Sequence, residues 1–541
     1  MTNYSKLLTA AILPAAMTGT STAAPNPAAQ NKKPNLIFVF ADQWRKQAFG
    51  YRGEDPVQTP HFDRFASWAF SFDNAVACCP VSTPNRACLL TGKYPINSGV
   101  FANNVPLAPD ENTLGSLCKG AGYNTAFIGK WHLNGLVDQV LDKSRRHGFD
   151  HWVQSIGHAP FNQRYYIGDS QTPVFIRDIW SPTYETDVAI EYISKVKDQS
   201  EPFCVVISYN PPHTSGSRGF EDRYQPGKRE NGQIKYGYGY GGPREYEALY
   251  TGIDYVKNPI RGNVMPVGRD KDESGPVVPG YFGAITAMDN DFGNLIKYLE
   301  ENGLMENTIV LFTADHGEAM GSHGLMTKGT WFEESVGVPF IIGWKGKTAS
   351  KRVKAPFNSI DVLPTLLGMM DIAAPKDMDG TDFSKMVFGG NFKAPEYAML
   401  TFNFGGVKEL YAPRYWRALY SDRYTYVLCG MNSNRSKFTK DGEVLYDRLK
   451  DPLQLSPIFR GDGQDKLMDK LHNELAAMLK AEGDPFITDY WHVEQPGYPK
   501  LNRYTMSLEE VKSKIDSGEI MSNSARNRQQ QAAPANNNRR Q

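Results

Sequence analysis

The sequence predicts an α/β protein with a large, mostly parallel sheet, helices on both faces of that sheet, and a smaller C-terminal antiparallel sheet with a helix. Short continuous apolar runs are typical of parallel strands that are buried on both faces. Such runs occur at residues 34–40, 123–128, 202–208 and 308–312. Helical periodicity precedes two of them, at residues 182–196 and 281–301, and this alternation is typical of a parallel sheet. From residue 415 the pattern changes to short strands separated by turns, followed by a helix near residues 466–481.

Chain length and charge limit the class of protein. With 541 residues, the chain is too long for one small core. We predict a signal peptide at residues 1–24, a main α/β domain at 25–400, a C-terminal subdomain at 401–505, and a helical segment with a disordered tail at 506–541. The 59 Lys and Arg residues balance the 59 Asp and Glu residues. No global field therefore attracts nucleic acid or an anionic membrane.

The first residues are typical of an export signal. A weakly basic start at Lys6, an apolar stretch and small residues near Ala24 form this pattern. Because the apolar stretch is too short to span a bilayer, we expect a periplasmic or secreted protein without a membrane span. A frayed N-terminus is the alternative. The six cysteines form no CxxC pair and no metal-binding spacing with histidine, so most are predicted to be buried thiols.

Residues 82–92, with the sequence STPNRACLLTG, predict a tight turn followed by a helix. Pro84 restricts the backbone just after Ser82, and Arg86 lies one helical turn beyond the serine. Apolar Leu89 and Leu90 begin a face that would anchor the helix. Two interpretations are open from these residues alone: a nucleophile at the mouth of the helix, or an ordinary serine N-cap.

Polar residues follow each of the four apolar runs. Ligands bind at the carboxyl ends of strands in open α/β sheets. Asp42 and Gln43 follow the first run and offer oxygen ligands suited to Ca²⁺ or Mg²⁺. The other runs lead to Lys130 and His132, to His213 after two prolines, and to Asp315 and His316, with Lys328 in the loop beyond. The i, i+2 spacing of the lysine and histidine at 130 and 132 predicts that both point to one side of an extended chain. Each motif alone is also compatible with a turn or a structural residue.

Taken in order, these motifs resemble those of the formylglycine-dependent sulfatases of the alkaline-phosphatase-like superfamily. The residues that carry the resemblance are Ser-x-Pro-x-Arg-x-x-x-x-Thr-Gly from Ser82, Gly-Lys-Trp-His-Leu around Lys130, Pro-Pro-His ending at His213, and Asp-His-Gly from Asp315. The chain resembles the serine type, in which a maturing enzyme oxidises the serine to formylglycine. The resemblance implies a sulfuric ester hydrolase of this fold.

The resemblance also implies roles for the site residues. A metal ion, Ca²⁺ rather than Mg²⁺, would be bound by Asp42, Gln43, residue 82, Asp315 and His316. Arg86, Lys130 and Lys328 would bind the sulfate oxygens and offset transition-state charge. His213 would protonate the departing alcohol, and His132 would be the base that regenerates the aldehyde. Two departures concern the metal: Gln43 replaces an aspartate of many relatives, which removes a negative charge, and an imidazole is a less usual Ca²⁺ ligand than oxygen.

A sulfated carbohydrate is the expected substrate, because aromatic side chains can stack on sugar rings. The aromatic residues that we expect in loops are Trp152, Tyr165, Tyr166 and Trp180, and a Gly- and Tyr-rich insertion covers residues 215–280. Asn104 and Arg177 are candidate sugar contacts, although a solvated-loop role is equally compatible with them. Two alternatives stay open: a phosphonate or phosphate ester hydrolase on the same scaffold, and a non-catalytic polysaccharide-binding protein with unmodified Ser82.

Overall fold

The computed structural model describes residues 33–135, 140–214, 240–253, 255, 257–265, 277–403, 416–429, 438–484 and 486. The predicted signal peptide, the C-terminal tail and much of the 215–280 insertion lie outside these residues. No helix within the described ranges is long and apolar enough to cross a membrane.

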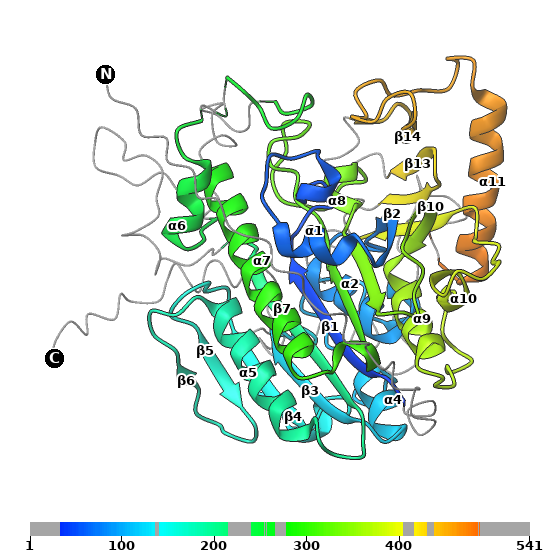
Figure 1. Cartoon of the computed structure of the whole chain (residues 1–541). Coiled ribbons are helices and arrows are strands. Elements are labelled where there is room, and N and C mark those ends of the chain that lie inside the picture. Colours follow the sequence, from blue (N-terminus) through cyan, green and yellow to red (C-terminus); the bar gives the residue numbers. More distant parts are fainter. Residues whose placement is uncertain are drawn as a thin grey trace, which may run out of the picture. The chain divides into compact units, whose positions relative to one another are not determined.

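The main sheet has ten strands in the order β10-β2-β9-β8-β1-β7-β3-β4-β5-β6 (Figure 1). The strands are β1 (Asn35–Asp42), β2 (Phe70–Val76), β3 (Asn124–Gly129), β4 (His151–Ile156), β5 (Arg164–Ile167), β6 (Val174–Phe175), β7 (Phe203–Pro212), β8 (Thr308–Ala314), β9 (Phe340–Trp344) and β10 (Lys351–Asn358). The five central strands, β8 to β4 in this order, are parallel to one another. Of the ten strands, β9 and β5 run antiparallel to the rest. The predicted, mostly parallel sheet is confirmed.

The four apolar runs seen in the sequence form four adjacent strands, β8, β1, β7 and β3, at the centre of the sheet. Every residue of β1, β7 and β8 is buried, because helices cover both faces. The four carboxyl ends therefore meet at one edge, and the polar residues that follow each strand are brought together there.

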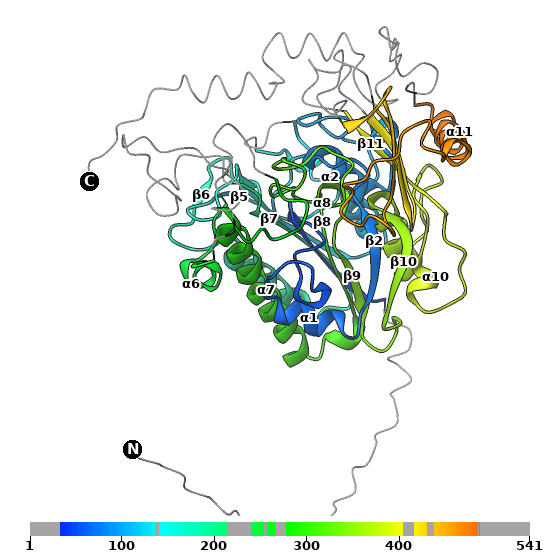
Figure 2. The same cartoon turned by 90° about the horizontal axis from the view of Figure 1, so that it is seen from above.

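Helices lie on both faces of the sheet (Figures 1 and 2). On one face, α7 (Val278–Glu301) contacts α1 (Pro60–Ala66) and α5 (Ser181–Val196); on the other, α2 (Ser82–Thr91) contacts α4 (Leu114–Gly120) and α9 (Val362–Met369). The shorter helices are η2 (Gly50–Arg52), α3 (Pro95–Ser98), η3 (Lys143–Arg145), α6 (Arg244–Glu247), η5 (Ala248–Tyr250), η7 (Met305–Asn307), α8 (Glu333–Val336), η8 (Ser359–Asp361) and α10 (Ser384–Val387). The predicted helices at 182–196 and 281–301 correspond to α5 and α7.

A second, antiparallel sheet has the order β11-β12-β13-β14. Its strands are β11 (Ala398–Phe402), β12 (Trp416–Tyr420), β13 (Tyr424–Cys429) and β14 (Glu443–Asp447). Helix α11 (Asp465–Ala481) packs on β12 and β13 through an apolar stripe that includes Met468, Leu471, Leu475 and Leu479. The predicted antiparallel sheet with a helix is confirmed. All six cysteines are buried free thiols, as predicted.

Candidate active site

Ser82 is the first residue of α2 and is only 2% exposed. The N-cap position is taken by Val81, whose backbone is extended, so the serine does not cap the helix. Its Oγ lies 3.0 Å from His316 Nε2, at the carboxyl edge of the sheet. The local sequence thus presents the hydroxyl to the residues that follow β8.

Asp42, Asp315 and His316 form a buried group whose ligand atoms all lie within 4.8 Å of one another. His316 Nδ1 donates to the carbonyl oxygen of Gly317 over 3.0 Å, which leaves the Nε2 lone pair facing the site. Nε2 is 3.5 Å from an oxygen of each aspartate. Burial lowers the pKa of His316 to about 4, so the imidazole is neutral, as a metal ligand must be.

The donor set fits a divalent cation. Asp42 Oδ1 is buried and has no hydrogen-bond partner among the described residues, a costly state for a carboxylate oxygen unless a cation compensates it. Two carboxylates with a neutral imidazole are suitable ligands for such an ion. Gln43 lies beside this group: its Oε1 accepts a hydrogen bond from Lys328 Nζ over 2.6 Å.

Arg86 links both aspartates to the neighbouring strands. Its Nε donates to Asp315 Oδ2 at 3.0 Å, and one terminal nitrogen donates to Asp42 Oδ2 at 3.1 Å. The other terminal nitrogen donates to the Lys130 carbonyl at 2.7 Å and to Ser208 Oγ at 2.8 Å. The guanidinium is fully buried, so it fixes the carboxylates rather than facing solvent.

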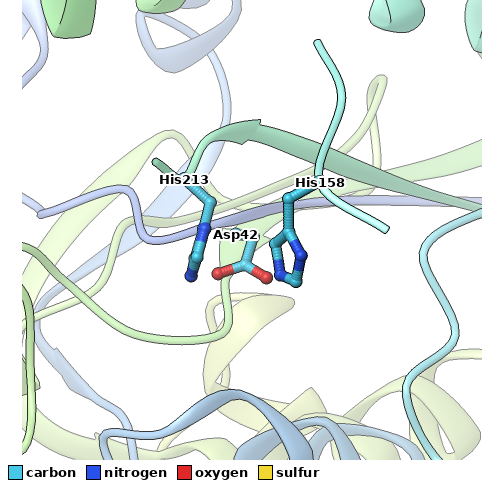
Figure 3. A group of neighbouring side chains, drawn as sticks. All are labelled: Asp42, His158 and His213. Carbon is cyan, nitrogen blue, oxygen red and sulfur yellow. The ribbon is translucent and has the colours of Figure 1, made fainter. Parts of the chain in front are cut away.

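Two lysines and two histidines surround the Asp42 carboxylate. Lys130 Nζ forms an ion pair with Asp42 and lies 3.0 Å from His158 Nε2. Lys328 Nζ lies 2.9 Å from His213 Nε2. Figure 3 shows the imidazoles of His158 and His213 on either side of the carboxylate; their ring centroids are 4.5 Å apart.

Burial is the main cause of the lowered pKa values of Lys130, Lys328 and His213. It lowers the pKa of Lys130 to about 8 against the opposing effect of Asp42. It also lowers the pKa of Lys328. The pKa of His213 falls well below its usual value through burial and the charge of Lys328. Because His213 Nδ1 lies 2.7 Å from the Thr214 carbonyl oxygen, a neutral ring holds its proton on Nδ1 and accepts from Lys328 at Nε2.

The prediction that Lys130 and His132 lie on one side of an extended chain is wrong, because the backbone is not extended at these residues. Strand β3 ends at Gly129, whose φ is +106° and where a Cβ would lie 2.1 Å from the Ser208 carbonyl oxygen. His132 has a φ of +58°, so the chain is not extended here. The His132 ring still lies near Lys130, whose charge, after burial, lowers the histidine pKa. His132 Nε2 is 3.1 Å from Asn104 Oδ1.

Comparison with known proteins identifies the family. Residues 34–372 match the model of the sulfatase family, and residues 321–481 match that of the N-sulphoglucosamine sulphohydrolase C-terminal region. The chain belongs to the sulfatase family. It is a sulfuric ester hydrolase with the alkaline-phosphatase-like fold, as the resemblance implied.

Relatives of this sulfatase match over most of their length. An ulvan-active sulfatase from Formosa agariphila is 33% identical over 474 residues, which cover 86% of this chain and 85% of the relative. An endo-4-O-sulfatase from Bacteroides thetaiotaomicron is 28% identical over 519 residues, covering 85% and 95%. A solved Bacteroides thetaiotaomicron structure, described in the context of glycosaminoglycan metabolism, has a TM-score of 0.72 at 27% identity and covers 85% and 98%.

The residues suggested for sugar binding are placed differently from the sulfatase site residues. Arg177 is exposed and stacks over Phe175, 5.1 Å from its ring centroid. Trp152 and Tyr165 were expected in loops, but they lie in β4 and β5 and are buried. Trp152 stacks on Phe127, with ring centroids 5.1 Å apart. Large aromatics suit a covered sheet face as well as a sugar, and here packing prevails.

Sequence reasoning missed His158, which lies in the loop after β4. The one usable signal was its position after a strand that ends at the same edge as β3. It also missed Asn85, whose side chain donates to the Asp315 carbonyl and accepts from Ser359 Oγ at 2.6 Å. This contact ties helix α2 to the segment that carries Asp315 and His316.

Proposed function

We propose that this sulfatase removes sulfate from a sulfated carbohydrate, with a formylglycine made from Ser82 as its nucleophile and Ca²⁺ as its metal. The main support is the meeting of Ser82 with the Asp42, Asp315 and His316 group, next to the buried cations Arg86 and Lys130. We assign the ion to Asp42, Gln43, Asp315, His316 and residue 82. Relatives named for ulvan and for glycosaminoglycan metabolism support the substrate class.

The formylglycine and the metal ion would supply the nucleophile and the local positive charge. A hydrated formylglycine supplies one hydroxyl to attack sulfur and another that allows sulfate to leave, while a divalent cation stabilises negative charge beside it. Ser82 is 2% exposed within α2, so the maturing enzyme must reach it before the chain folds. Such maturation, followed by export through the signal at residues 1–24, is the route we propose.

The chain's own residues bind the sulfate and move protons. Lys130 Nζ pairs with Asp42 and Lys328 Nζ donates to Gln43 Oε1, and both ammonium groups can turn to the sulfate oxygens of a bound ester. Arg86 is engaged with four acceptors, so we assign it to holding the carboxylates as well as to offsetting charge.

Proton transfer is assigned to the two histidines. His213 and Lys328 share one hydrogen bond at 2.9 Å, so a proton that passes from Nζ to Nε2 can go on to the departing alcohol oxygen. His132 donates from Nε2 to Asn104, and its buried Nδ1 has no partner among the described residues. That lone pair can accept the proton that is lost when residue 82 returns to the aldehyde.

Mass spectrometry and sulfate release test this proposal. The peptide that contains residue 82 should be lighter than its unmodified form by the mass of H₂. The protein should release sulfate from sulfated oligosaccharides, and Ser82→Ala should lose turnover with unchanged thermal unfolding, while the buried control Ser71→Ala keeps activity. Full activity of Ser82→Ala would refute the mechanism. Faster cleavage of phosphate or phosphonate esters would favour the phosphohydrolase alternative, and ligand retention with an unmodified serine would favour a binding protein.

A further inference from the structure

A cavity of about 730 Å³ is lined by residues of and around α5, α6 and α7. Its walls come from the segment that leads into α5, from the short helix α6 and from the middle of α7 (Figure 1). Its volume is within the range of small-molecule sites. None of the residues assigned above to sulfate or metal binding lines it.

The lining combines apolar rings with polar groups. Trp180 and Phe161 line one wall, with ring centroids 5.1 Å apart, and Tyr246 comes from α6. Ile179, also on the wall, is 44% exposed. Aromatic surface next to hydrogen-bonding groups is suited to a sugar ring, which has apolar faces and a rim of hydroxyls.

Two buried polar atoms of lining residues have no partner among the described residues. Asp291 is 2% exposed; its Oδ1 accepts from Thr183 at 2.8 Å, but its Oδ2 has no partner. The indole Nε1 of Trp180 is in the same state. The two groups are neighbours: burial raises the pKa of the Asp291 carboxyl to about 7, and the Thr183 hydroxyl and the Trp180 indole both act against that rise. One hydroxyl group can satisfy both, because it donates to a carboxylate and accepts from an N–H.

The charges on the wall exclude a second sulfate. Among the described lining residues, the carboxylates of Asp178 and Glu245 outnumber the single cation, Arg244, and Asp291 adds a third carboxyl group whose pKa burial raises to about 7. An anionic group would meet like charge here. The ligand that fits is therefore an uncharged sugar.

A short backbone segment connects the wall of the cavity to the proposed sulfate site. Phe161 on its wall comes three residues after His158, which lies 3.0 Å from Lys130. Three residues span at most about 10 Å. This segment is fixed at both ends, because Asn210 Nδ2 donates to Gly157 O at 3.0 Å and Ser181 N donates to Pro160 O at 2.8 Å. A short oligosaccharide can reach both places.

We propose that this cavity is a subsite for an unsulfated sugar residue of the same chain that carries the scissile sulfate. The subsite rests on the proposed carbohydrate substrate and adds a specificity to it. The enzyme should prefer an oligosaccharide to the corresponding sulfated monosaccharide, because only the longer ligand fills both places.

Kinetics of two cavity variants on matched substrates test the subsite. Tyr246→Ala removes a ring, and Asp291→Asn replaces the carboxyl group with an amide of nearly the same shape. Each should lower kcat/KM for a sulfated oligosaccharide about tenfold or more. The values for the sulfated monosaccharide and for an aryl sulfate should stay within twofold of the wild-type values. Tyr298→Ala, on α7 but not on the cavity wall, is the matched control.

The outcomes separate the two proposals. If the wild-type enzyme desulfates the oligosaccharide and both folded variants do so equally well, the subsite is refuted and the proposed function stands. Equal losses on all three substrates also refute the subsite, because they indicate general damage, which thermal unfolding would reveal. If the wild-type enzyme cleaves the aryl sulfate but no carbohydrate sulfate, the proposed substrate class fails and the subsite falls with it.

Discussion

Replacing Arg86 with lysine should weaken metal binding without removing any proposed metal ligand. Arg86 donates to one oxygen of Asp42 and one of Asp315, and to two further acceptors on neighbouring strands. Lysine keeps the positive charge, but its single ammonium lacks the planar fork that reaches both carboxylates together. The two carboxylates would then lose their fixed orientation.

The size of the effect follows from the bonds that are lost. Two charge-assisted hydrogen bonds at about 1.5–3 kcal/mol each give a loss of about 3–6 kcal/mol in the free energy of unfolding. Groups that orient metal ligands typically contribute about 10–100-fold to metal affinity. We therefore expect Ca²⁺ affinity of Arg86→Lys to fall by that factor.

Calcium titration by calorimetry, together with urea unfolding, measures both quantities. Arg417→Lys is a matched control: Arg417 is also buried, and it pairs with Asp484 in the C-terminal subdomain. The control should lose comparable stability but keep wild-type Ca²⁺ affinity. Wild-type Ca²⁺ affinity in Arg86→Lys would refute the orienting role, and equal affinity losses in both variants would show that only stability is being measured.

Three further changes are predicted. Burial alone would raise the pKa of Glu333, but the charges of Lys46 and Arg448 outweigh burial and hold the pKa at about 2. This lowered pKa contributes about 3 kcal/mol to the free energy of unfolding; the contribution is present above pH 4.5 and is lost as the pH falls towards 2. In Glu333→Gln, the free energy of unfolding measured with urea should fall less steeply between pH 4.5 and pH 2 than in the wild type. An unchanged pH dependence would contradict the assignment. Lys328→Ala should lower kcat/KM for sulfate esters about 10²–10³-fold, and wild-type kinetics would exclude a sulfate contact. Gln43→Glu should lower the melting temperature in EDTA yet gain more from added Ca²⁺ than the wild type gains; equal gains would place residue 43 outside the metal site.

The sequence could predict the centre of the fold because the relevant signals are local. Each of the strands β1, β3, β7 and β8 contains a short apolar run, and the residue types that follow the strand are those that bind anions or cations. Parallel strands place these carboxyl ends at one edge. The candidate site therefore follows from pattern and topology together.

Other features depend on contacts between segments that are distant in sequence. His158 belongs to no motif, and only the packing of its loop against β7 brings it to Lys130 and His213. Trp152 is an aromatic residue between His151 and Val153, and the sequence does not say that the sheet face above it is covered. The cavity lined by α5, α6 and α7 brings together residues near 161, 180, 245 and 291, and no local sequence pattern predicts this combination.

The role of Gln43 also changes once its neighbours are known. The sequence alone indicates that glutamine removes one negative charge from the metal site. In the structure, the amide nitrogen of Gln43 donates to the buried carboxylate of Glu318 and to Tyr240. A carboxylate only accepts, so the amide must turn its nitrogen there and its oxygen towards Lys328 and the site. Glu318 also accepts from the backbone of Met320 and Thr327, at the start of the loop that carries Lys328. The negative charge is thus retained next to the proposed metal site, where it orients the Gln43 amide oxygen and fixes the loop of the lysine that we propose binds sulfate.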